Sequence, residues 1–474
     1  MPHSGNTTAD PESVDFASDA DHEPRLFPAF TLLASKFEPH RVGEVAILDG
    51  TGRFFLGRDG EALDAITFAR LWPGAIEPTG PLAGKTLSNQ QLQLDVDGDD
   101  VDVINLGRRT LYLNGKETKR ARLRPDDVLN IENRWVLLFS MRAASIPKRA
   151  DLGMHAFGEP DRFGIVGESP AIWELRERIA FVAQFDEHVL ILGETGTGKE
   201  LIAKAIHMLS RRARGPFIDQ NSAMFPRELM VAQLTGNPKD WPNPGMPASE
   251  GLLGAARGGT LFLDEIGQLP KELQAALLRV LDPDASYQRL GDPKPLKADF
   301  RCIAATNSAP RDLKSDLAPR FQHRIENPPL DLRREDIPLL ARALMLKAAA
   351  KSPEAASKFI RADGPRHEAN LDPAFVAHLV QRDYPGNVRD LAIVLREAMG
   401  ASRDDMLHAT PAMLAQTPGP ELAATAPAPT PPTEAEVRDA LARHDGHKTR
   451  AAESLGITRF TLTRLLKKHG PRAA

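Results

Sequence analysis

The stretch "GETGTGKE", residues 193–200, has the form G-x-x-x-x-G-K and ends the apolar run "HVLILG". It opens a segment whose apolar residues recur at helical spacing on one expected buried stripe: Leu201, Ile202, Ala205, Ile206 and Leu209. A strand, a glycine-rich turn and a helix in this order are the setting in which such a loop holds phosphates. The glycines let backbone N–H groups approach the phosphates, the helix start favours negative charge, and Lys199 reaches the β- and γ-phosphates.

We therefore expect a nucleotide site built from one continuous set of residues: Gly193, Glu194, Thr195, Gly196, Thr197, Gly198, Lys199 and Glu200. A Ser or Thr usually follows the lysine to hold magnesium, and Glu200 stands there instead. A second motif, "GGTLFLDEIGQLP" at 258–270, is an apolar strand that ends in two acids. Asp264 at such a strand end can hold Mg²⁺, and Glu265 can polarise the attacking water. Together the motifs predict a domain that binds and hydrolyses ATP with Mg²⁺.

The overall composition sets limits on the class of protein. The 474 residues suit about two to four domains, and a hydrophobic content of 42% can bury several cores. The formal net charge is −4, so attraction to nucleic acid must come from a local patch. The single cysteine, Cys302, excludes an intrachain disulfide framework, suits a reducing compartment and is expected in a core. Without a run of about 18 apolar residues or a secretory leader, we expect a cytoplasmic protein with no membrane partner.

Periodicity and composition divide the chain into modules of different fold class. Short runs with period-two alternation, broken by Gly, Asp and Asn, predict an all-β sandwich. Apolar strands that alternate with helical stretches predict an α/β P-loop domain with a helical lid, and the last segment predicts a small all-α domain. The expected boundaries are 1–27 for a disordered leader, 28–141 for the sandwich, 142–162 for a linker, 163–330 for the α/β ATPase subdomain, 331–412 for the lid, 413–432 for an Ala/Pro linker and 433–474 for the all-α domain.

Seven motifs follow one another in the order of a known family: "IVGESPAIWELRERI", "GETGTGKE", "GGTLFLDEIGQLP", "LLRVL", "CIAATN", "REDIPLLA" and "YPGNVRDL". They closely resemble the AAA+ domain of bacterial enhancer-binding proteins, the sigma-54-dependent transcriptional regulators, over about residues 163–400. The phosphate loop of that family also carries Glu after its lysine. The resemblance implies an ATPase that forms a hexameric ring, with further nucleotide contacts from Ile165, Val166 and Arg389.

The same resemblance implies roles for single residues. Asn307, at the end of "CIAATN", looks like the sensor of the γ-phosphate, and Asn221 in "PFIDQNSA" looks like the switch residue that engages Glu265. The stretch "LKSDLAPRF" aligns with a helix that supplies two arginine fingers to the neighbouring subunit, at Lys314 and Arg320. Arg320 is the main candidate, because a finger stabilises charge in the transition state and the lysine departs from the family pattern.

The loop between the two nucleotide motifs, "NPKDWPNPGM" at 237–246, departs from the family most strongly. Sigma-54 activators carry the hexapeptide Gly-Ala-Phe-Thr-Gly-Ala in this loop, and it aligns with residues 240–245. The aromatic is kept as Trp241, but Pro242 and Pro244 stiffen the backbone. Three interpretations of Trp241 and Asn243 are open. They form an altered contact to sigma-54 holoenzyme, they contact a different partner, or they belong to a loop without contact function. An exposed tryptophan among prolines favours a recognition role.

The N-terminal β region resembles a forkhead-associated (FHA) domain, a phosphothreonine-binding sandwich, through "FLGRDG", "LSNQQLQL" and "NLGRRTLYLNGK". The family positions that hold the phosphopeptide match a short set: Arg58, Ser88, Asn89 and Arg109. Asn89 replaces the family arginine, Gln91 the structural histidine, and Arg109-Thr110 an Asn-Gly pair. Arginines with Ser88 can still clamp a phosphate through charge-assisted hydrogen bonds. The alternative is a sandwich that binds an unmodified protein or packs on the ring.

The C-terminal segment resembles a Fis-type helix-turn-helix, in which "AAESLGITRFTLTRLLKK" gives helix, glycine turn and a helix capped by Thr458. Its expected core is Val437, Leu441, Ala451, Ala452, Leu455, Ile457, Leu462 and Leu465. The second helix exposes polar residues that suit contacts to double-stranded DNA as a dimer: Arg459, Thr461, Thr463, Arg464, Lys467 and Lys468.

The leading hypothesis is a ring-forming ATPase of the sigma-54 activator type, bound to DNA and controlled by the FHA-like sandwich. A second hypothesis is a DNA-binding AAA+ regulator or scaffold that does not remodel sigma-54 holoenzyme and acts on another partner through the Trp241 loop. A third is a phosphopeptide-binding adaptor with a vestigial motor, which the intact nucleotide motifs disfavour.

Overall fold

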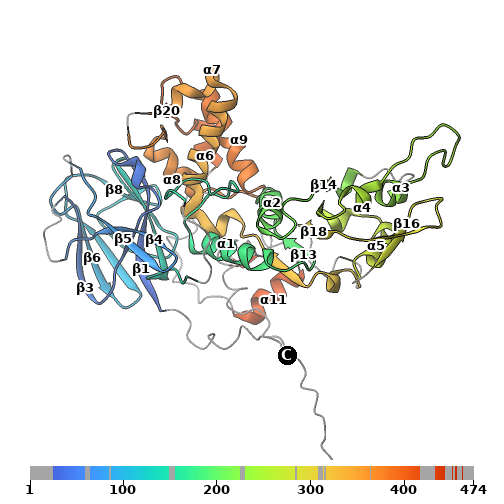
Figure 1. Cartoon of the computed structure of the whole chain (residues 1–474). Coiled ribbons are helices and arrows are strands. Elements are labelled where there is room, and N and C mark those ends of the chain that lie inside the picture. Colours follow the sequence, from blue (N-terminus) through green and yellow to red (C-terminus); the bar gives the residue numbers. More distant parts are fainter. Residues whose placement is uncertain are drawn as a thin grey trace, which may run out of the picture.

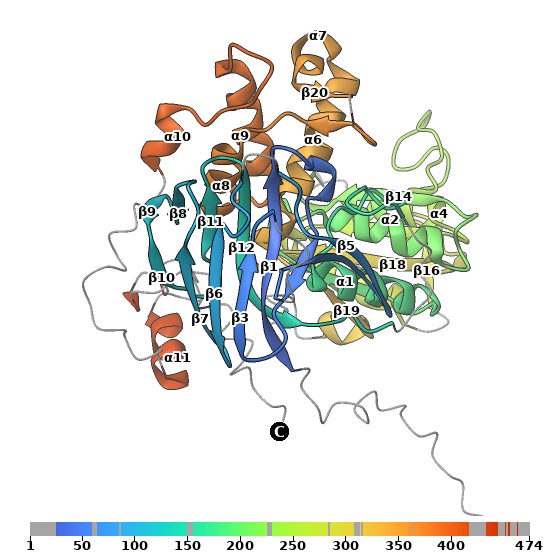
Figure 2. The same cartoon turned by 90° about the vertical axis from the view of Figure 1, so that its left-hand side faces the viewer.

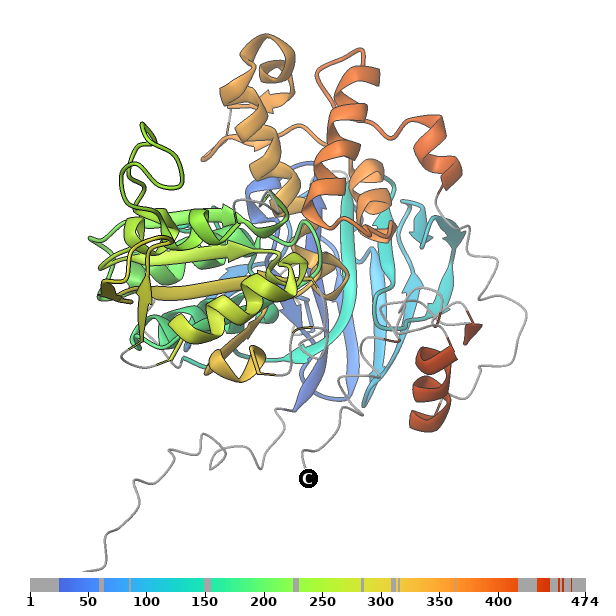
Figure 3. The same ribbon diagram turned by 90° about the vertical axis from the view of Figure 1, so that its right-hand side faces the viewer.

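The structure is a computed structural model that describes residues 25–58, 64–84, 87–148, 155–224, 230–282, 285–307, 313, 316–362, 364–416, 433–443, 451, 454–455 and 462. Among these residues, no helix is both long enough and apolar enough to cross a membrane. Three bodies lie against one another, and Figure 3 shows the orange helical lid above the green-to-yellow α/β domain and the blue-to-teal β-sandwich.

The N-terminal body is a sandwich of two antiparallel sheets (Figures 1 and 2). The larger sheet has the order β5-β4-β2-β1-β12-β11-β8-β9, with β5 (Ala75–Gly80), β4 (Phe68–Trp72), β2 (Val45–Ile47), β1 (Leu26–Ser35), β12 (Trp135–Ala143), β11 (Val128–Ile131), β8 (Leu111–Leu113) and β9 (Lys116–Thr118). The smaller sheet has the order β10-β7-β6-β3, with β10 (Arg120–Arg122), β7 (Asp100–Asn105), β6 (Leu92–Asp97) and β3 (Gly52–Leu56). Alternate residues of β6 are buried, as the period-two pattern predicts. The expected all-β sandwich is confirmed.

The core of the sandwich lies between the two sheets, where Phe30, Leu32 and Trp135 of the larger sheet pack against Leu94 and Val103 of the smaller one. One short helical turn, η2 (Pro39–Arg41), follows β1.

The central body is a five-stranded parallel sheet in the order β14-β15-β18-β13-β19, with β14 (Phe217–Asn221), β15 (Thr260–Asp264), β18 (Arg301–Thr306), β13 (Val189–Leu192) and β19 (His323–Glu326). Val189 and Ile191 pack on one face with α1 (Pro170–Ala183) and α2 (Lys199–Leu209). Leu190 and the fully buried Cys302 lie in the core of the opposite face, which is covered by α3 (Met230–Thr235), α4 (Gly251–Ala255) and α5 (Lys271–Val280). The parallel α/β prediction and the core position of Cys302 are confirmed.

Short elements complete this domain: η3 (Ser222–Met224), η4 (Ile266–Gln268), the hairpin β16 (Ser286–Gln288) and β17 (Pro295–Lys297), and η6 (Ala318–Arg320). The lid follows with η7 (Leu330–Asp336), α6 (Ile337–Lys351), α7 (Pro353–Ala356), η8 (Ser357–Phe359), β20 (Ile360–Arg361), β21 (Glu368–Ala369), α8 (Pro373–Gln381), α9 (Val388–Ala401) and α10 (Pro411–Gln416). The last described helix is α11 (Glu434–Arg443).

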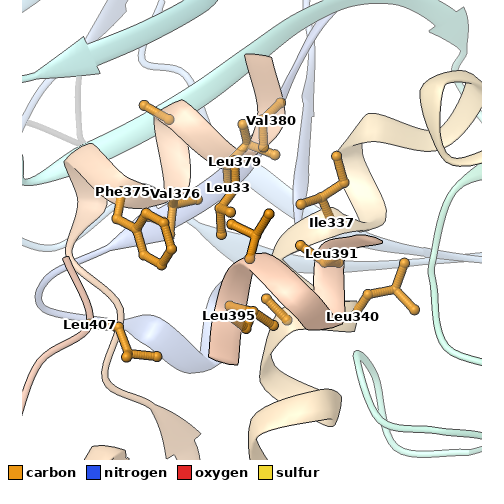
Figure 4. Packing of buried hydrophobic residues seen from close by; sticks show 14 of the residues in the cluster. Leu33, Ile337, Leu340, Phe375, Val376, Leu379, Val380, Leu391, Leu395 and Leu407 are labelled. Carbon is orange, nitrogen blue, oxygen red and sulfur yellow. The ribbon is translucent and has the colours of Figure 1, made fainter. Parts of the chain in front are cut away.

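The sandwich and the lid share one hydrophobic core. Leu33 of β1 lies among Val376 and Leu379 of α8 and Leu391 of α9 (Figure 4). Strands β11 and β12 contribute further apolar side chains to this core, so α8 packs across three strands of the larger sheet. The sequence predicts separate modules, and periodicity along one segment carries no signal for this contact.

Part of the segment expected as a linker at 142–162 is packed. Ile146 and Phe157 are buried in a small cluster with Trp72 of the sandwich and Trp173 of α1. The connector thus joins the two bodies through a second apolar contact.

Candidate nucleotide site and neighbouring surfaces

The phosphate loop lies between β13, which ends at Leu192, and α2, which begins at Lys199. Gly196 and Gly198 have φ of +77° and +100°, in the left-handed region that favours glycine. A Cβ on Gly196 would also lie 2.1 Å from the carbonyl oxygen of Gly386, so the lid approaches the loop too closely for any side chain there. The loop therefore has the backbone geometry that the glycine-rich motif predicts.

Lys199 lies in this loop, and its side chain is largely buried. Its Nζ donates to the carbonyl oxygens of Gly193 at 3.0 Å and Glu194 at 3.1 Å. The same Nζ is 3.7 Å from Glu265 Oε1. The ammonium group is thus held between the loop and the second acidic motif, in the position from which a phosphate can replace its carbonyl partners.

Three neighbouring strand ends bring the remaining polar candidates to one edge of the sheet, where parallel strands place their functional residues. Asp264 ends β15 and pairs in register with Asn221 at the end of β14. The Nδ2 of Asn307, after β18, donates to Thr195 Oγ1 at 3.2 Å, and its backbone N–H lies 3.4 Å from Glu265 Oε2. The side chain of Asn221 accepts from the backbone N–H of Ala223 at 2.9 Å, so its described contact is local.

A cavity of about 610 Å³ lies between the phosphate loop, the acids after β15 and the lid. Its polar wall includes Lys199, Asp264, Glu265, Arg333 and Arg389, and its apolar wall includes Ile165, Val166, Leu340 and Leu344. A cavity of this size and mixed lining fits a nucleotide, with the base on the apolar side and the phosphates at the loop.

Leu201 corrects the expected helical stripe of α2. It is 39% exposed and lines the cavity, whereas Ile202, Ala203 and Ile206 are buried against the sheet. Leu201 therefore contacts the nucleotide pocket and not the core.

Arg333 is a cavity residue that sequence analysis missed. It is 4% exposed, and its Nη2 lies 3.5 Å from the carbonyl oxygen of Thr197 in the phosphate loop. Burial lowers the pKa of its guanidinium from the ordinary value, while Asp336 opposes that shift. Its only signal in the sequence is that it directly precedes the motif "REDIPLLA", which begins at Arg334.

The expected arginine finger lies outside the cavity of its own chain. Arg320, in η6, forms an ion pair with Asp282, and its side chain is 41% exposed. The second finger position, Lys314, lies outside the described residues.

The loop at 236–250 is ordered by its own hydrogen bonds and projects away from the sheet at the upper right of Figure 1. The Nδ2 of Asn237 donates to the carbonyl oxygens of Pro238 at 3.0 Å and Pro247 at 3.2 Å. The backbone N–H of Asp240 donates to the carbonyl oxygen of Met246 at 2.8 Å. Residues 242–250, which include Asn243, are exposed.

The expectation of an exposed Trp241 is wrong, because its ring is half-buried against the β16–β17 hairpin. A Cβ on Gly291 of that hairpin would lie 2.3 Å from Trp241 Cδ1, so only glycine leaves room for the indole. The backbone N–H of Leu290 donates to the carbonyl oxygen of Gly236 at 2.9 Å and closes the same contact. Trp241 thus braces the loop, and Met246, at 43% exposed, is a large apolar side chain of the same loop.

The sandwich gathers three of its four expected phosphopeptide residues at one loop cluster. The guanidinium of Arg58 donates to Asn89 Oδ1 at 2.8 and 3.2 Å. Ser88 Oγ accepts from the backbone N–H of Arg108 at 3.1 Å. Arg109 instead forms an ion pair with Glu132 at 2.9 Å.

Gln91 holds these loops together. It is fully buried, and its Nε2 donates to Asn105 Oδ1 at 2.8 Å and to the carbonyl oxygen of Arg109 at 3.0 Å. Gln91 thus connects the loop that ends at Arg109 to Asn105 at the end of β7.

The C-terminal segment is described in part. Val437, Leu441, Ala451, Leu455 and Leu462 form a small core, as the sequence predicts. The expected DNA-contact residues Arg459, Thr461, Thr463, Arg464, Lys467 and Lys468 lie outside the described residues.

Three sequence profiles of known families match the chain in order. A "Sigma-54 interaction domain" matches residues 165–326, an "AAA+ ATPase lid domain" residues 332–417, and "Bacterial regulatory protein, Fis family" residues 435–469. These matches begin after the β-sandwich.

Individual relatives agree with these profiles. The chain is 34% identical over 334 residues to the regulatory protein AtoC of Escherichia coli (strain K12), covering 65% of this chain and 68% of the relative. It is 36% identical over 320 residues to the transcriptional regulatory protein ZraR of the same strain, covering 65% of this chain and 69% of the relative. A crystal structure of NtrX from Brucella abortus is 32% identical, with a TM-score of 0.46, over 65% of this chain and 70% of that chain.

Proposed function

Because the chain belongs to the family of sigma-54-dependent transcriptional regulators, which combine an AAA+ ATPase with a Fis-type helix-turn-helix, we propose that it uses ATP hydrolysis to open promoters bound by sigma-54 RNA polymerase holoenzyme. The observation that carries the proposal is the meeting of the phosphate loop, the acids after β15 and the lid in one cavity. Family membership makes the protein an ATPase and a DNA-binding regulator. The residues assigned below are our proposal.

Each polar group at the cavity has a defined task. Lys199 and the loop N–H groups bind the phosphates, and Glu265 holds and polarises the attacking water. Asn307 and Asn221 adjust Glu265 to the state of the nucleotide, with Asn307 already beside its carboxylate. Arg389 approaches the nucleotide from the lid.

The donors at this edge fit Mg²⁺. That ion takes oxygen ligands, with one or two carboxylates from the protein and the rest from phosphates and water. Asp264, at the strand end and on the wall of the cavity, supplies such a carboxylate. Magnesium bound with ATP would neutralise charge on the phosphates.

We propose that Arg320 acts on the nucleotide of a neighbouring subunit. It lies at the surface outside its own cavity, where Asp282 pairs with it. In a hexameric ring, Arg320 and Lys314 of one subunit would reach the γ-phosphate of the next. The helix-turn-helix, as a dimer, would hold the ring on double-stranded DNA upstream of the promoter.

The Trp241 loop could contact sigma-54 holoenzyme or another partner, and a promoter-opening assay distinguishes these two functions. With purified chain, sigma-54 holoenzyme and DNA that carries its upstream region, we expect ATP-dependent opening. Trp241→Ala should reduce opening by about tenfold or more, because the indole braces the loop against Gly291 and a loop without this support presents its exposed residues poorly to a partner. ATP turnover should stay within about twofold, because Trp241 does not line the cavity.

Lys239→Ala, an exposed change in the same loop, is the control and should leave opening unchanged. ATP turnover by the unaltered chain without opening would contradict the proposal. It would favour the second function, a DNA-bound AAA+ regulator that acts on another partner, which the "DWPNPG" sequence motivates.

We also propose that the sandwich binds phosphothreonine proteins at Arg58, Ser88 and Asn89, with Arg108 beside them. The cluster has cationic side chains and a hydroxyl at exposed or half-buried positions, which suits a phosphate. Control of the ATPase by this binding is part of the proposal.

A pool of phosphothreonine peptides should bind the chain, and Arg58→Ala should weaken binding about tenfold, as expected on losing one or two charge-assisted hydrogen bonds. Fluorescence anisotropy with phosphorylated and unphosphorylated pools measures this. Arg109→Ala is the matched control, because Arg109 pairs with Glu132. Equal binding of both pools would reject phosphate recognition and favour an unmodified partner.

A further inference from the structure

Four consecutive residues of η7, Arg333 to Asp336, each contact a different part of the protein. Arg333 lines the nucleotide cavity beside Thr197. Arg334 donates to the carbonyl oxygen of Val380 in α8 at 2.8 Å. The next two residues contact the sandwich and the start of α1. The segment is therefore a junction through which these parts are fixed relative to one another.

Asp336 ties the junction to the α/β domain. Its Oδ1 accepts from the backbone N–H groups of Glu168 at 2.7 Å and Ser169 at 3.0 Å. Its Oδ2 accepts from the hydroxyl of Ser169. Ser169 caps α1, and the residues just before it include Ile165 and Val166 of the apolar cavity wall, so this tie also borders the nucleotide site.

Glu335 ties the junction to the sandwich. Its Oε2 accepts from Arg142 Nη1 at 2.9 Å and from the hydroxyl of Thr31 at 3.0 Å. The side chain of Arg142 is 6% exposed and that of Glu335 is 15% exposed. Breaking so enclosed a charge pair costs much free energy, because removing one partner leaves the other charge buried without compensation.

The Arg142–Glu335 ion pair is not the main attraction between the sandwich and the lid. Their shared apolar core, with Leu33 against α8, provides that attraction. The free energy of an apolar contact is roughly proportional to the buried area and has no preferred direction. The hydrogen bonds of Glu335, in contrast, are directional. The pair therefore fixes the position of η7 on the sandwich.

Arg333 is two residues before Glu335, and its backbone leaves helical geometry, with φ of −141° and ψ of 45°. This backbone turn directs the Arg333 side chain to the phosphate loop while Glu335 faces the sandwich. Two peptide units therefore connect the ion pair at the sandwich to the guanidinium at the cavity.

We infer that Arg142 and Thr31 of the sandwich, acting through Glu335, are positioning residues for Arg333 at the nucleotide site. The β-sandwich thereby sets the affinity of the ATPase for its nucleotide. This inference rests on the ATPase part of the proposed function and is independent of sigma-54 and of phosphopeptide binding.

The test uses the full chain with Arg142→Met, which keeps side-chain length and removes the charge. We expect the KM for ATP and the Kd for a non-hydrolysable ATP analogue to rise about tenfold, with kcat within about twofold, as a typical coupling between sites predicts. Arg142→Lys should restore part of the affinity. Arg122→Met, which removes an exposed arginine that pairs with Asp102 on the smaller sheet, is the matched control and should leave both constants unchanged.

A double-mutant cycle separates positioning from a general loss of stability. In an Arg333→Met background, Arg142→Met should cause no further loss of ATP affinity, because the residue it positions is gone. Thr31→Val removes only the hydroxyl contact and should raise the Kd by a smaller factor in the folded protein. Additive losses in the cycle, or an unchanged KM in Arg142→Met and Thr31→Val, would overturn the inference. Absence of ATP binding by the unaltered chain would instead reject the ATPase assignment.

Discussion

Glu265→Gln should lower ATP turnover by about 10²- to 10⁴-fold, the usual contribution of a positioned general base, while ATP binding stays within about twofold. The amide keeps the shape of the side chain but cannot take a proton from the attacking water. Glu265 follows Asp264 in a left-handed backbone conformation, which directs it to the cavity beside Lys199 and Asn307. Phosphate release measures turnover, and a fluorescent ATP analogue measures binding.

Two further variants test whether the loss of turnover is specific to Glu265. Glu187→Gln, a surface change in the same domain, should leave turnover unchanged. Lys199→Ala should weaken binding itself, because it removes the cation from the phosphate loop. Normal turnover in Glu265→Gln would show that another group polarises the water.

Arg320→Ala should lower turnover by about 10³-fold, at the lower end of what a finger supplied in trans contributes, with ATP binding retained. The guanidinium lies outside its own cavity, so its effect on chemistry requires a neighbouring subunit. Turnover at several protein concentrations, with a nucleotide-binding assay beside it, measures the change.

Mixing two inactive variants tests directly whether Arg320 acts on a neighbouring subunit. Subunits with Arg320→Ala keep an intact phosphate loop, and subunits with Lys199→Ala keep an intact finger, so mixed rings should regain turnover. Asp282→Asn removes the intrachain ion pair and should leave turnover within about twofold. If Asp282→Asn matches Arg320→Ala, the arginine has a structural role and the finger assignment fails.

Much of the architecture could be predicted from local sequence patterns. The phosphate loop, the apolar strand before Asp264 and the alternation in β6 each depend on residues close together in the chain, so spacing alone predicted their form. The positions of Lys199, Asp264 and Glu265 around one cavity follow from the rule that parallel strands present functional residues at their carboxyl ends.

Contacts between distant segments were not predictable in this way. Thr31 and Glu335 are 304 positions apart, and neither residue belongs to a motif that points to the other. Trp241, in a loop rich in prolines, was expected at the surface, but the space that receives it is created by Gly291 in the β16–β17 hairpin. Arg109 likewise has a partner, Glu132, that no spacing rule selects.

The shared core of sandwich and lid has a consequence for how the chain acquires its structure. Leu33, Val128, Val136 and Leu138 bury their side chains against helices that are synthesised more than 200 residues later. Until α8 is complete, this sheet face is in contact with water, and an exposed apolar sheet face favours association between chains. The boundary between sequence modules therefore does not separate two hydrophobic cores, because sandwich and lid share one. A fragment that ends in the connector would retain the sandwich sequence but lack the helices that cover one of its two faces.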